Sequence, residues 1–166
     1  YGKEKRQKNW DSAKSKHSIS DIPKVKSAVK NAQIFVRTDP IFDGFSDELE
    51  GVLACEPDVV MLPYFKTVRE VETFIKAVDG RATTSLLLET RGAAEQIDDI
   101  ISVGGIDEIH IGLNDLSHSY GKKFLFEELA DGSARTVSET DLAALAGGER
   151  WEPVSYTHLR AHATGA

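Results

Sequence analysis

The sequence predicts an α/β fold built on a parallel sheet, and three observations support this prediction. Four short apolar segments of strand length are centred near Phe35, Val60, Leu87 and Ile109. A segment with apolar residues at helical spacing lies between each consecutive pair of these strands. Two of the strands end at a carboxylate or a few residues before one. Alternation of strands with helices is typical of parallel sheets, in which helices connect successive strands.

The first predicted helix follows Ser20, which can cap its N-terminus. Its apolar face consists of Ile22, Val25, Ala28 and Val29. The first strand then covers residues 33–37 and is closed by Thr38-Asp39-Pro40. Arg37 is the last residue of this strand, so we expect a guanidinium group at the end of an otherwise apolar segment.

The second and third βα units show equally clear start and stop signals. Ser46 opens a helix that ends before Pro57, and residues 58–63 form a nearly continuous apolar strand. Such a run is expected where both faces of a sheet are buried. Thr67-Val68-Arg69-Glu70 is a capping box at the start of the next helix. The apolar faces of these two helices consist of Leu49, Val52 and Leu53, and of Val68, Val71, Phe74, Ile75 and Val78.

The most informative stretch covers residues 82–121. A short strand, residues 85–88, stops at Glu89, and Thr90 can cap a helix that Gly104-Gly105 ends. A second strand, residues 108–111, runs into Gly112-Leu113-Asn114-Asp115. The helix has apolar residues at Ala93, Ala94, Ile97, Ile100 and Ile101. In a parallel βαβ unit both acids lie at the C-terminal edge of the sheet, where α/β barrels keep their chemistry.

The same stretch carries a family resemblance. LLLET followed by GIDEIHIGLNDLS resembles the paired signature of the HpcH/HpaI aldolase and citrate lyase family. The resemblance implies a partial (β/α)8 TIM-type barrel of about four βα units, corresponding to strands two to five or to strands two and four to six. It also implies a lyase that makes or breaks a carbon–carbon bond beside a 2-oxo acid or an acyl-CoA.

The resemblance further implies a divalent-metal site. By analogy with the family, Glu89 and Asp115 would hold Mg²⁺, or another divalent cation such as Mn²⁺. Arg37 would bind the substrate carboxylate and carbonyl oxygen, a task that suits the planar guanidinium fork. The backbone groups of Leu113 and Asn114 would hold a substrate carboxylate. On the residues alone, the two acids and Arg37 could equally form structural hydrogen bonds at the ends of strands.

Two features leave the substrate and the base open. Family members that act on free pyruvate often carry Gln two residues before the metal-binding Glu, and here that residue is Leu87. This departure leaves room for the acyl-CoA branch. No residue is identified as the base. His17 is interpreted as a surface histidine and His110 as a hydrogen-bonded core histidine, whereas His118 has no assigned role.

Composition narrows the classes of partner. The net charge is −7 and the pI is near 5.2, which argues against nucleic acid or an anionic membrane as the main partner. No apolar run approaches the ~20 residues of a membrane span. The single cysteine, Cys55, excludes an internal disulfide and fits a cytoplasmic location. A small-molecule substrate is therefore expected, in an enzyme that is homo-oligomeric when complete, as the family resemblance implies.

Two regions are predicted along the 166 residues. Residues 1–132 would form the partial aldolase/lyase barrel, because a complete barrel takes roughly 250 residues. Residues 133–166 contain no strand where the next barrel strand is due and end in PVSYTHLRAHATGA, which resembles a tail found in translated cloning artefacts. We therefore expect a barrel fragment, with a disordered or non-native tail. Such a fragment would be catalytically inactive if essential strands are missing.

Overall fold

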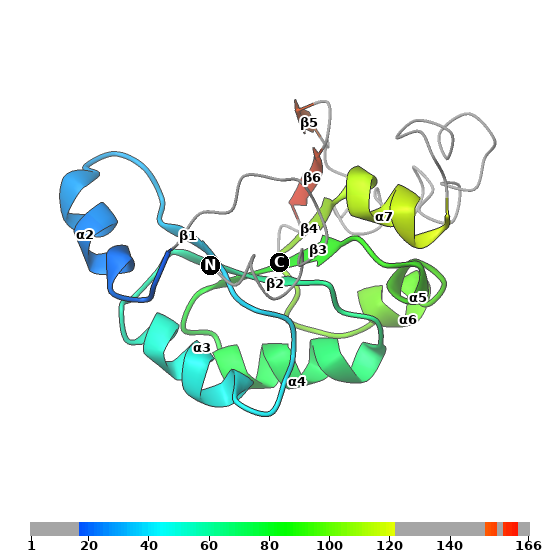
Figure 1. The fold of residues 1–166 in the computed structure, drawn as a ribbon, viewed down its shortest axis with the longest axis horizontal. Coiled ribbons are helices and arrows are strands. Elements are labelled where there is room, and N and C mark those ends of the chain that lie inside the picture. Colours follow the sequence, from blue (N-terminus) through cyan, green and yellow to red (C-terminus); the bar gives the residue numbers. More distant parts are fainter. Residues whose placement is uncertain (1–16, 122–151, 156–157, 163–166) are drawn as a thin grey trace.

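The computed structural model describes residues 17–121 and two further short strands, residues 152–155 and 158–162. Its centre is a parallel sheet of four strands: β1 (Phe35–Arg37), β2 (Val59–Pro63), β3 (Thr83–Leu88) and β4 (Glu108–Ile111). The strands lie side by side in chain order (Figure 1). The predicted α/β class and the predicted order of four βα units are confirmed.

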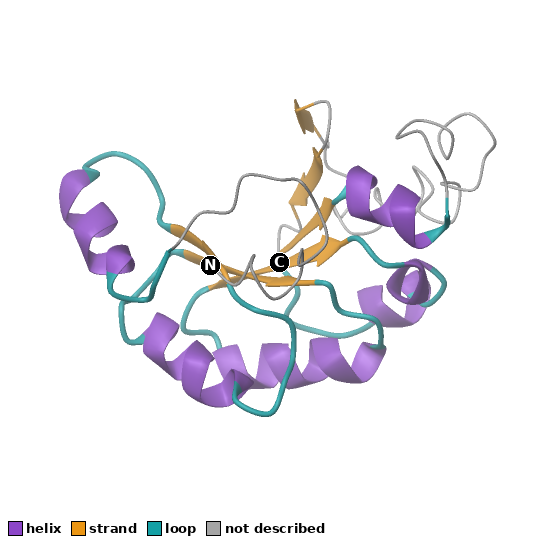
Figure 2. Ribbon diagram, in the orientation of Figure 1, coloured by secondary structure: helices purple, strands orange, loops and turns teal. Residues whose placement is uncertain are grey.

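Helices cover one face of this sheet. They are α3 (Phe45–Leu53), α4 (Val68–Val78), α5 (Arg91–Ala94) and α6 (Ile97–Ile101), all on the same side of the strands (Figure 2). Alternate strand residues pack against them, including Val36, Val60, Leu62, Leu86, Leu88, Ile109 and Ile111. Phe45 of α3 and Phe74 of α4 meet with ring centroids 6.5 Å apart and tie the two helices together. The residues between these positions therefore face the opposite side of the sheet.

The sheet is curved, and its inner face is the one opposite the helices. Strands in a sheet lie about 4.8 Å apart, so β1 and β4 would be about 14 Å apart if the sheet were flat. The rings of Phe35 on β1 and His110 on β4 nevertheless meet edge to face, with centroids 5.7 Å apart. This contact across two intervening strands requires the curvature of a barrel wall, and it directs both side chains into the concave side.

The N-terminal helix differs from its prediction. Helix α2 (Asp21–Ala28) follows Ser20, but the Ser20 side chain makes no capping bond. Asp21 instead accepts hydrogen bonds from the backbone N–H and hydroxyl of Ser18. No residue of α2 is buried, and Val25 remains 51% exposed. Of the predicted apolar face, Ile22 packs against the core as a partly buried residue, whereas Val25, Ala28 and Val29 are exposed.

The helix predicted between Glu89 and Gly104 is divided into α5 and α6. Thr90 caps α5 as predicted, since its hydroxyl accepts the Ala93 N–H. The chain then leaves helical geometry at Gln96, whose side-chain amide donates to the carbonyls of Lys66 and Gly92. These bonds to a neighbouring loop stabilise a break that apolar spacing alone does not reveal.

Two strands in the C-terminal region correct the expectation of a strandless tail. Strand β6 (His158–His162) pairs antiparallel with β4, and β5 (Glu152–Ser155) pairs antiparallel with β6. The open edge of β4 offers unpaired backbone groups to any extended segment, so pairing there does not require an apolar pattern. The rest of the predicted tail lies outside the described residues.

Candidate active site

The inner face of the curved sheet carries the polar side chains that the fold brings together. Residues that are partners in the strand register point to the same side, and one row across the sheet is Arg37, Met61, Ser85 and Glu108. The next row towards the C-terminal edge contains Pro63, Leu87 and His110. Glu89 follows β3 directly above this row. The site is thus built from the alternate residues that the helices do not cover.

Glu89 lies where the sequence predicts, at the end of β3, and it is 3% exposed. Its side chain packs against the backbone of Gly112, which follows β4. A Cβ atom at position 112 would lie 3.0 Å from the Glu89 Cβ and 3.2 Å from its Oε2. The Gly112 N–H also donates to the Leu88 carbonyl, at 2.9 Å, and so continues the pairing of the two strands. Glycine therefore makes room for the carboxylate at this edge.

Asp115 reaches the same edge from helix α7 (Leu113–Ser119), for which Gly112 is the N-cap residue. Asp115 is in the first turn of α7 and is half-buried, whereas Leu113 is buried and Asn114 is exposed. The structure thus places Asp115 three residues after the glycine that contacts Glu89. Both predicted metal ligands lie at the C-terminal edge of neighbouring strands.

Arg37 is half-buried at the end of β1, two strands away from β3. The backbone just beyond it is fixed, because Thr38 donates through its N–H and hydroxyl to the Met61 carbonyl. Asp39 follows as a buried residue whose N–H donates to the buried Glu48 carboxylate, at 2.9 Å. These bonds hold the end of β1 and with it the base of the Arg37 side chain.

Two inner-face residues were not identified as a pair from the sequence. Glu108 and His110 alternate along β4 with Ile109 and Ile111, which pack under the helices. The His110 Nε2 lies 3.3 Å from the Glu108 Oε2, and the Glu108 side chain is only 5% exposed. The interpretation of His110 as a hydrogen-bonded histidine is therefore confirmed, and the structure adds that it faces into the concave side. The signal in the sequence that could have identified this pair is an acid two residues before a histidine on a predicted strand, because such residues point to the same side.

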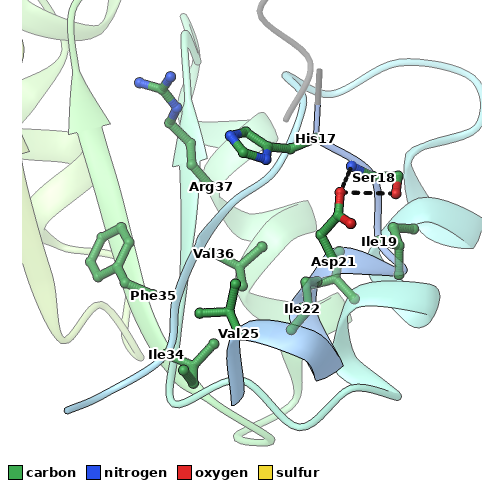
Figure 3. A pocket seen from close by; sticks show the side chains of 11 residues that line it. His17, Ser18, Ile19, Asp21, Ile22, Val25, Ile34, Phe35, Val36 and Arg37 are labelled. Carbon is green, nitrogen blue, oxygen red and sulfur yellow. Dashed lines mark hydrogen bonds between the residues drawn. The ribbon is translucent and has the colours of Figure 1, made fainter. Parts of the chain in front are cut away.

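A cavity of about 370 Å³ lies beside the open edge of β1 (Figure 3). It separates α2 from the strand, with Ile22 and Val25 on one side and Ile34 and Val36 on the other. Arg37 and His17 contribute to its lining, whereas Glu89 and Asp115 do not. The cavity therefore adjoins the inner face through Arg37 and Phe35, which both contribute to its lining.

The resolved pKa shifts belong to groups at the periphery. The hydrogen bond from Lys24, helped by those from Ser18, lowers the pKa of Asp21 to about 2 at the margin of the cavity. A two-pronged hydrogen bond from Arg81 lowers the pKa of Glu50 on α3. Both carboxylates support local structure and lie away from the C-terminal edge of β3 and β4.

The donor set at that edge fits magnesium. Within the described residues, no three His, Cys, Asp or Glu side chains are grouped closely enough to hold a metal ion by themselves. Magnesium prefers oxygen ligands and is often held by one or two carboxylates, with water and substrate completing its coordination. Glu89 and Asp115 supply two carboxylates at one sheet edge, which is the number and type that such an ion needs.

No helix in the described part of the chain is long and apolar enough to cross a membrane.

Comparisons with solved structures find the same architecture. An HpcH/HpaI aldolase from Desulfitobacterium hafniense DCB-2 superposes with a TM-score of 0.61 at 16% identity, covering 76% of this chain and 62% of that one. A family protein from Burkholderia cenocepacia J2315 gives a TM-score of 0.65 at 12% identity, covering 78% and 64%. The chain therefore spans less than two thirds of the length of these relatives.

A third similar structure is the citrate lyase beta subunit of M. tuberculosis, with a TM-score of 0.52 at 22% identity over 79% of this chain and 60% of that one. No curated protein matches the sequence. The family model for HpcH/HpaI aldolase/citrate lyase matches residues 10–143, which include the whole parallel sheet and the edge that carries Glu89 and Asp115. The chain belongs to the HpcH/HpaI aldolase/citrate lyase family.

Proposed function

We propose that the chain is the site-bearing part of a magnesium-dependent lyase that cleaves or forms a carbon–carbon bond beside a 2-oxo acid. The observation that carries this proposal is the position of Glu89 and Asp115 at one sheet edge. Gly112 packs against the Glu89 side chain and is the N-cap residue of the helix that carries Asp115. The M. tuberculosis relative is complexed with oxaloacetate and magnesium, which are a 2-oxo acid and the proposed cation. Family membership supports the lyase class, and the magnesium requirement is our proposal.

Cleavage of a bond next to a carbonyl leaves an enolate, whose oxygen carries the developing charge. Magnesium held by Glu89 and Asp115 would supply a Lewis acid for that oxygen. Arg37 would bind the substrate carboxylate with two parallel hydrogen bonds and add positive charge on the same side. The backbone N–H groups of Leu113 and Asn114, in the first turn of α7, would donate to a substrate carboxylate, because first-turn amides have no partner within the helix.

An acyl-CoA substrate is the alternative within the same chemistry, and Leu87 favours it. Leu87 is 3% exposed and lies on the inner face in the row next to Glu89. A buried aliphatic side chain cannot donate a hydrogen bond to a free 2-oxo acid as a glutamine would. Parallel assays with a 4-hydroxy-2-oxo acid and with an acyl-CoA ester such as citramalyl-CoA distinguish the two substrates.

The test is a pair of isosteric substitutions, Glu89→Gln and Asp115→Asn, in the full chain. Each removes one charged ligand, so we expect magnesium binding measured by calorimetry to be lost or greatly weakened in both variants. Magnesium-dependent cleavage should be abolished in each, and the double variant should be little worse than either single one, because one lost ligand already disables the unit. Glu95→Gln is the matched control, because it makes the same kind of change at an exposed glutamate in the segment that follows Glu89.

Normal magnesium binding in either variant would refute the metal site. Activity that survives a chelator would refute the magnesium requirement. Circular dichroism of every variant separates loss of the site from loss of the fold. A wild-type chain that binds magnesium and cleaves neither substrate would refute both substrate assignments for this chain.

A further inference from the structure

The outer edge of β1 is open, and the strand register shows which backbone groups it presents. Strand β1 pairs with β2 on one side and is the last strand of the sheet on the other. The Ile34 carbonyl and the Thr38 N–H both bond to β2. Successive residues of a strand direct their backbone groups to opposite sides, so the N–H and C=O groups of Phe35 and Arg37 point away from β2. The open edge therefore offers two donors and two acceptors.

The cavity beside β1 follows this edge. All four residues from Ile34 to Arg37 line it, and Ile22 and Val25 of α2 face them from the other side (Figure 3). Its volume of about 370 Å³ lies within the range of protein ligand sites, about 300–1,000 Å³. Val25 is 51% exposed, so the helix presents an apolar side chain that the strand does not cover. The cavity is thus a groove between a helix and an open strand edge, which we call the α2–β1 groove.

Contacts at both ends of α2 set the width of this groove. Ile19, just before the helix, packs on α3, where its Cδ1 would lie 3.1 Å from a Cβ atom at Gly51. Lys26, in the last turn, donates to the Glu56 carbonyl at 2.9 Å and contacts the Glu56 carboxylate at 3.2 Å. The helix is therefore held by α3 and by the loop before β2, and the α2–β1 groove is formed without a ligand.

One end of the groove is cationic. Arg37 is half-buried, and within the described residues its guanidinium has no hydrogen-bond or ion-pair partner. Asp21 and His17 also line the groove. The Asp21 carboxylate already accepts hydrogen bonds from Ser18 and from Lys24, whose Nζ lies 2.8 Å away. Burial removes part of the hydration of a charged group, so the Arg37 end of the groove favours an anionic ligand group such as a carboxylate.

We propose that the α2–β1 groove binds an extended peptide segment of another protein, with apolar side chains at alternate positions and its C-terminal carboxylate at Arg37. The main chain of the segment pairs with the open backbone groups of Phe35 and Arg37, as peptides do when they add a strand to a sheet edge. Its apolar side chains pack between α2 and the side chains of Ile34 and Val36. Arg37 lies at the C-terminal end of β1, so the segment runs parallel to this strand.

Two other occupants fit the groove less well. A simple aliphatic acid would pair with Arg37 but would leave the four open backbone groups of β1 unpaired in an apolar groove, which is unfavourable. A second copy that paired through its own β1 would bring its β2 to the side where α2 lies. A single extended segment avoids both problems. Because the Arg37 guanidinium is also the proposed substrate ligand, a bound peptide and a bound 2-oxo acid would exclude one another.

Calorimetry of the full chain with the peptide acetyl-Val-Ser-Val-Ser-Val, without magnesium or a 2-oxo acid, tests this proposal independently of the lyase reaction. We expect saturable binding that weakens about tenfold or more when the peptide carboxylate is amidated or in Arg37→Gln, because hydrogen bonds between charged groups are the stronger class. Val25→Glu places a charge in the apolar wall and should weaken binding by a similar factor. Arg69→Gln and Val29→Glu change exposed residues outside the groove lining and should bind the peptide as the wild type does.

Hydrogen exchange of the wild-type chain locates the bound peptide without any substitution. The Phe35 and Arg37 amides should become protected when the peptide binds, whereas the Val36 amide, which faces β2, should not change. Absence of saturable binding would overturn the site, and binding without protection of these two amides would overturn strand addition. Equal binding of hexanoate would make the groove a site for aliphatic acids, and protection that rises with chain concentration in the absence of peptide would assign it to a second copy; either result overturns the proposal.

Discussion

Gly112 shows how one residue couples the two proposed metal ligands. It ends the pairing of β3 with β4, serves as N-cap of the helix that carries Asp115, and packs against the Glu89 side chain. Its lack of a Cβ atom matters because of that close approach. The glycine in the GLND motif is thus explained by space for the carboxylate, which the sequence pattern alone does not reveal.

We expect Gly112→Ala to displace Glu89, because the new Cβ would lie 3.0 Å from the Glu89 Cβ, an atom close to the backbone that cannot rotate away. Magnesium affinity measured by calorimetry should fall about tenfold or more, since changes to groups that hold a metal ligand in place commonly cost about 10- to 100-fold in affinity. The matched control is Gly104→Ala, where a Cβ meets nothing within 4 Å. Equal magnesium affinity in the two variants would show that Glu89 tolerates the methyl group.

Arg37 gives a second prediction at this scale. Arg37→Lys keeps the charge and loses the two-pronged geometry, so in an active chain kcat should fall about 100- to 1000-fold. Arg69→Lys, on the exposed surface of α4, is the control and should leave turnover unchanged. Near-normal turnover and substrate affinity in Arg37→Lys would mean that Arg37 has a structural role at the end of its strand and does not bind the substrate through two hydrogen bonds.

The positions of side chains that follow the end of a strand agree with the sequence prediction, whereas the orientation of side chains within a strand could not be predicted. Glu89 directly follows β3, and Asp115 lies four residues beyond the end of β4, as predicted, while their role as metal ligands stays a prediction. The period of two along β4 separates His110 from Ile109 but does not say which side faces helices. That assignment depends on the long-range contact between Phe35 and His110, which arises from curvature of the whole sheet.

At the scale of elements, the predicted caps at Thr67 and Thr90 are present, whereas Ser20 makes no capping bond and α3 begins at Phe45, with Gly44 as its N-cap, instead of at Ser46. The Thr67 hydroxyl accepts the Glu70 N–H at 3.3 Å, and Glu70 Oε2 accepts the Thr67 N–H at 2.9 Å, so the predicted capping box is present. Helix α4 then buries Val71, Phe74 and Val78 along the predicted stripe. Cap and stripe agree here, whereas in α2 no residue is fully buried and Ile22 is the member of the predicted stripe that packs against the core.

The capping box supplies a stability prediction. Thr67→Ala should lower the free energy of unfolding by about 1 kcal/mol, the usual cost of losing an N-cap side chain. Thr73→Ala is the matched control on the same helix, because its hydroxyl only donates back to the Arg69 carbonyl within an exposed turn. Urea unfolding followed by circular dichroism measures both. The prediction fails if the two variants lose the same stability.

At the scale of the molecule, chain order and helix spacing were sufficient to predict the parallel sheet, because each βα unit follows its own local signals. They were insufficient at β4, whose outer edge pairs with β6 in the antiparallel sense. A closed barrel of parallel strands would need a parallel neighbour at that edge. The antiparallel pairing therefore occupies the position of the next barrel strand.

The last prediction concerns this edge. The described core cluster lies between Ile34 and Leu116, so a chain ending at Gly132 should keep the helix content and cooperative unfolding of the parallel unit. Removal of β6 should leave the backbone groups of β4 open, and open strand edges promote pairing between chains. We therefore expect the shortened chain to self-associate with increasing concentration in sedimentation experiments, while the 166-residue chain associates less.

Hydrogen exchange gives the complementary measurement, because pairing with β4 should protect amides within His158–His162 in the full chain. Unprotected amides there, with equal association of both chains, would mean that β6 does not cover the edge in solution. Unfolding of the shortened chain would instead mean that the C-terminal region contributes to the core.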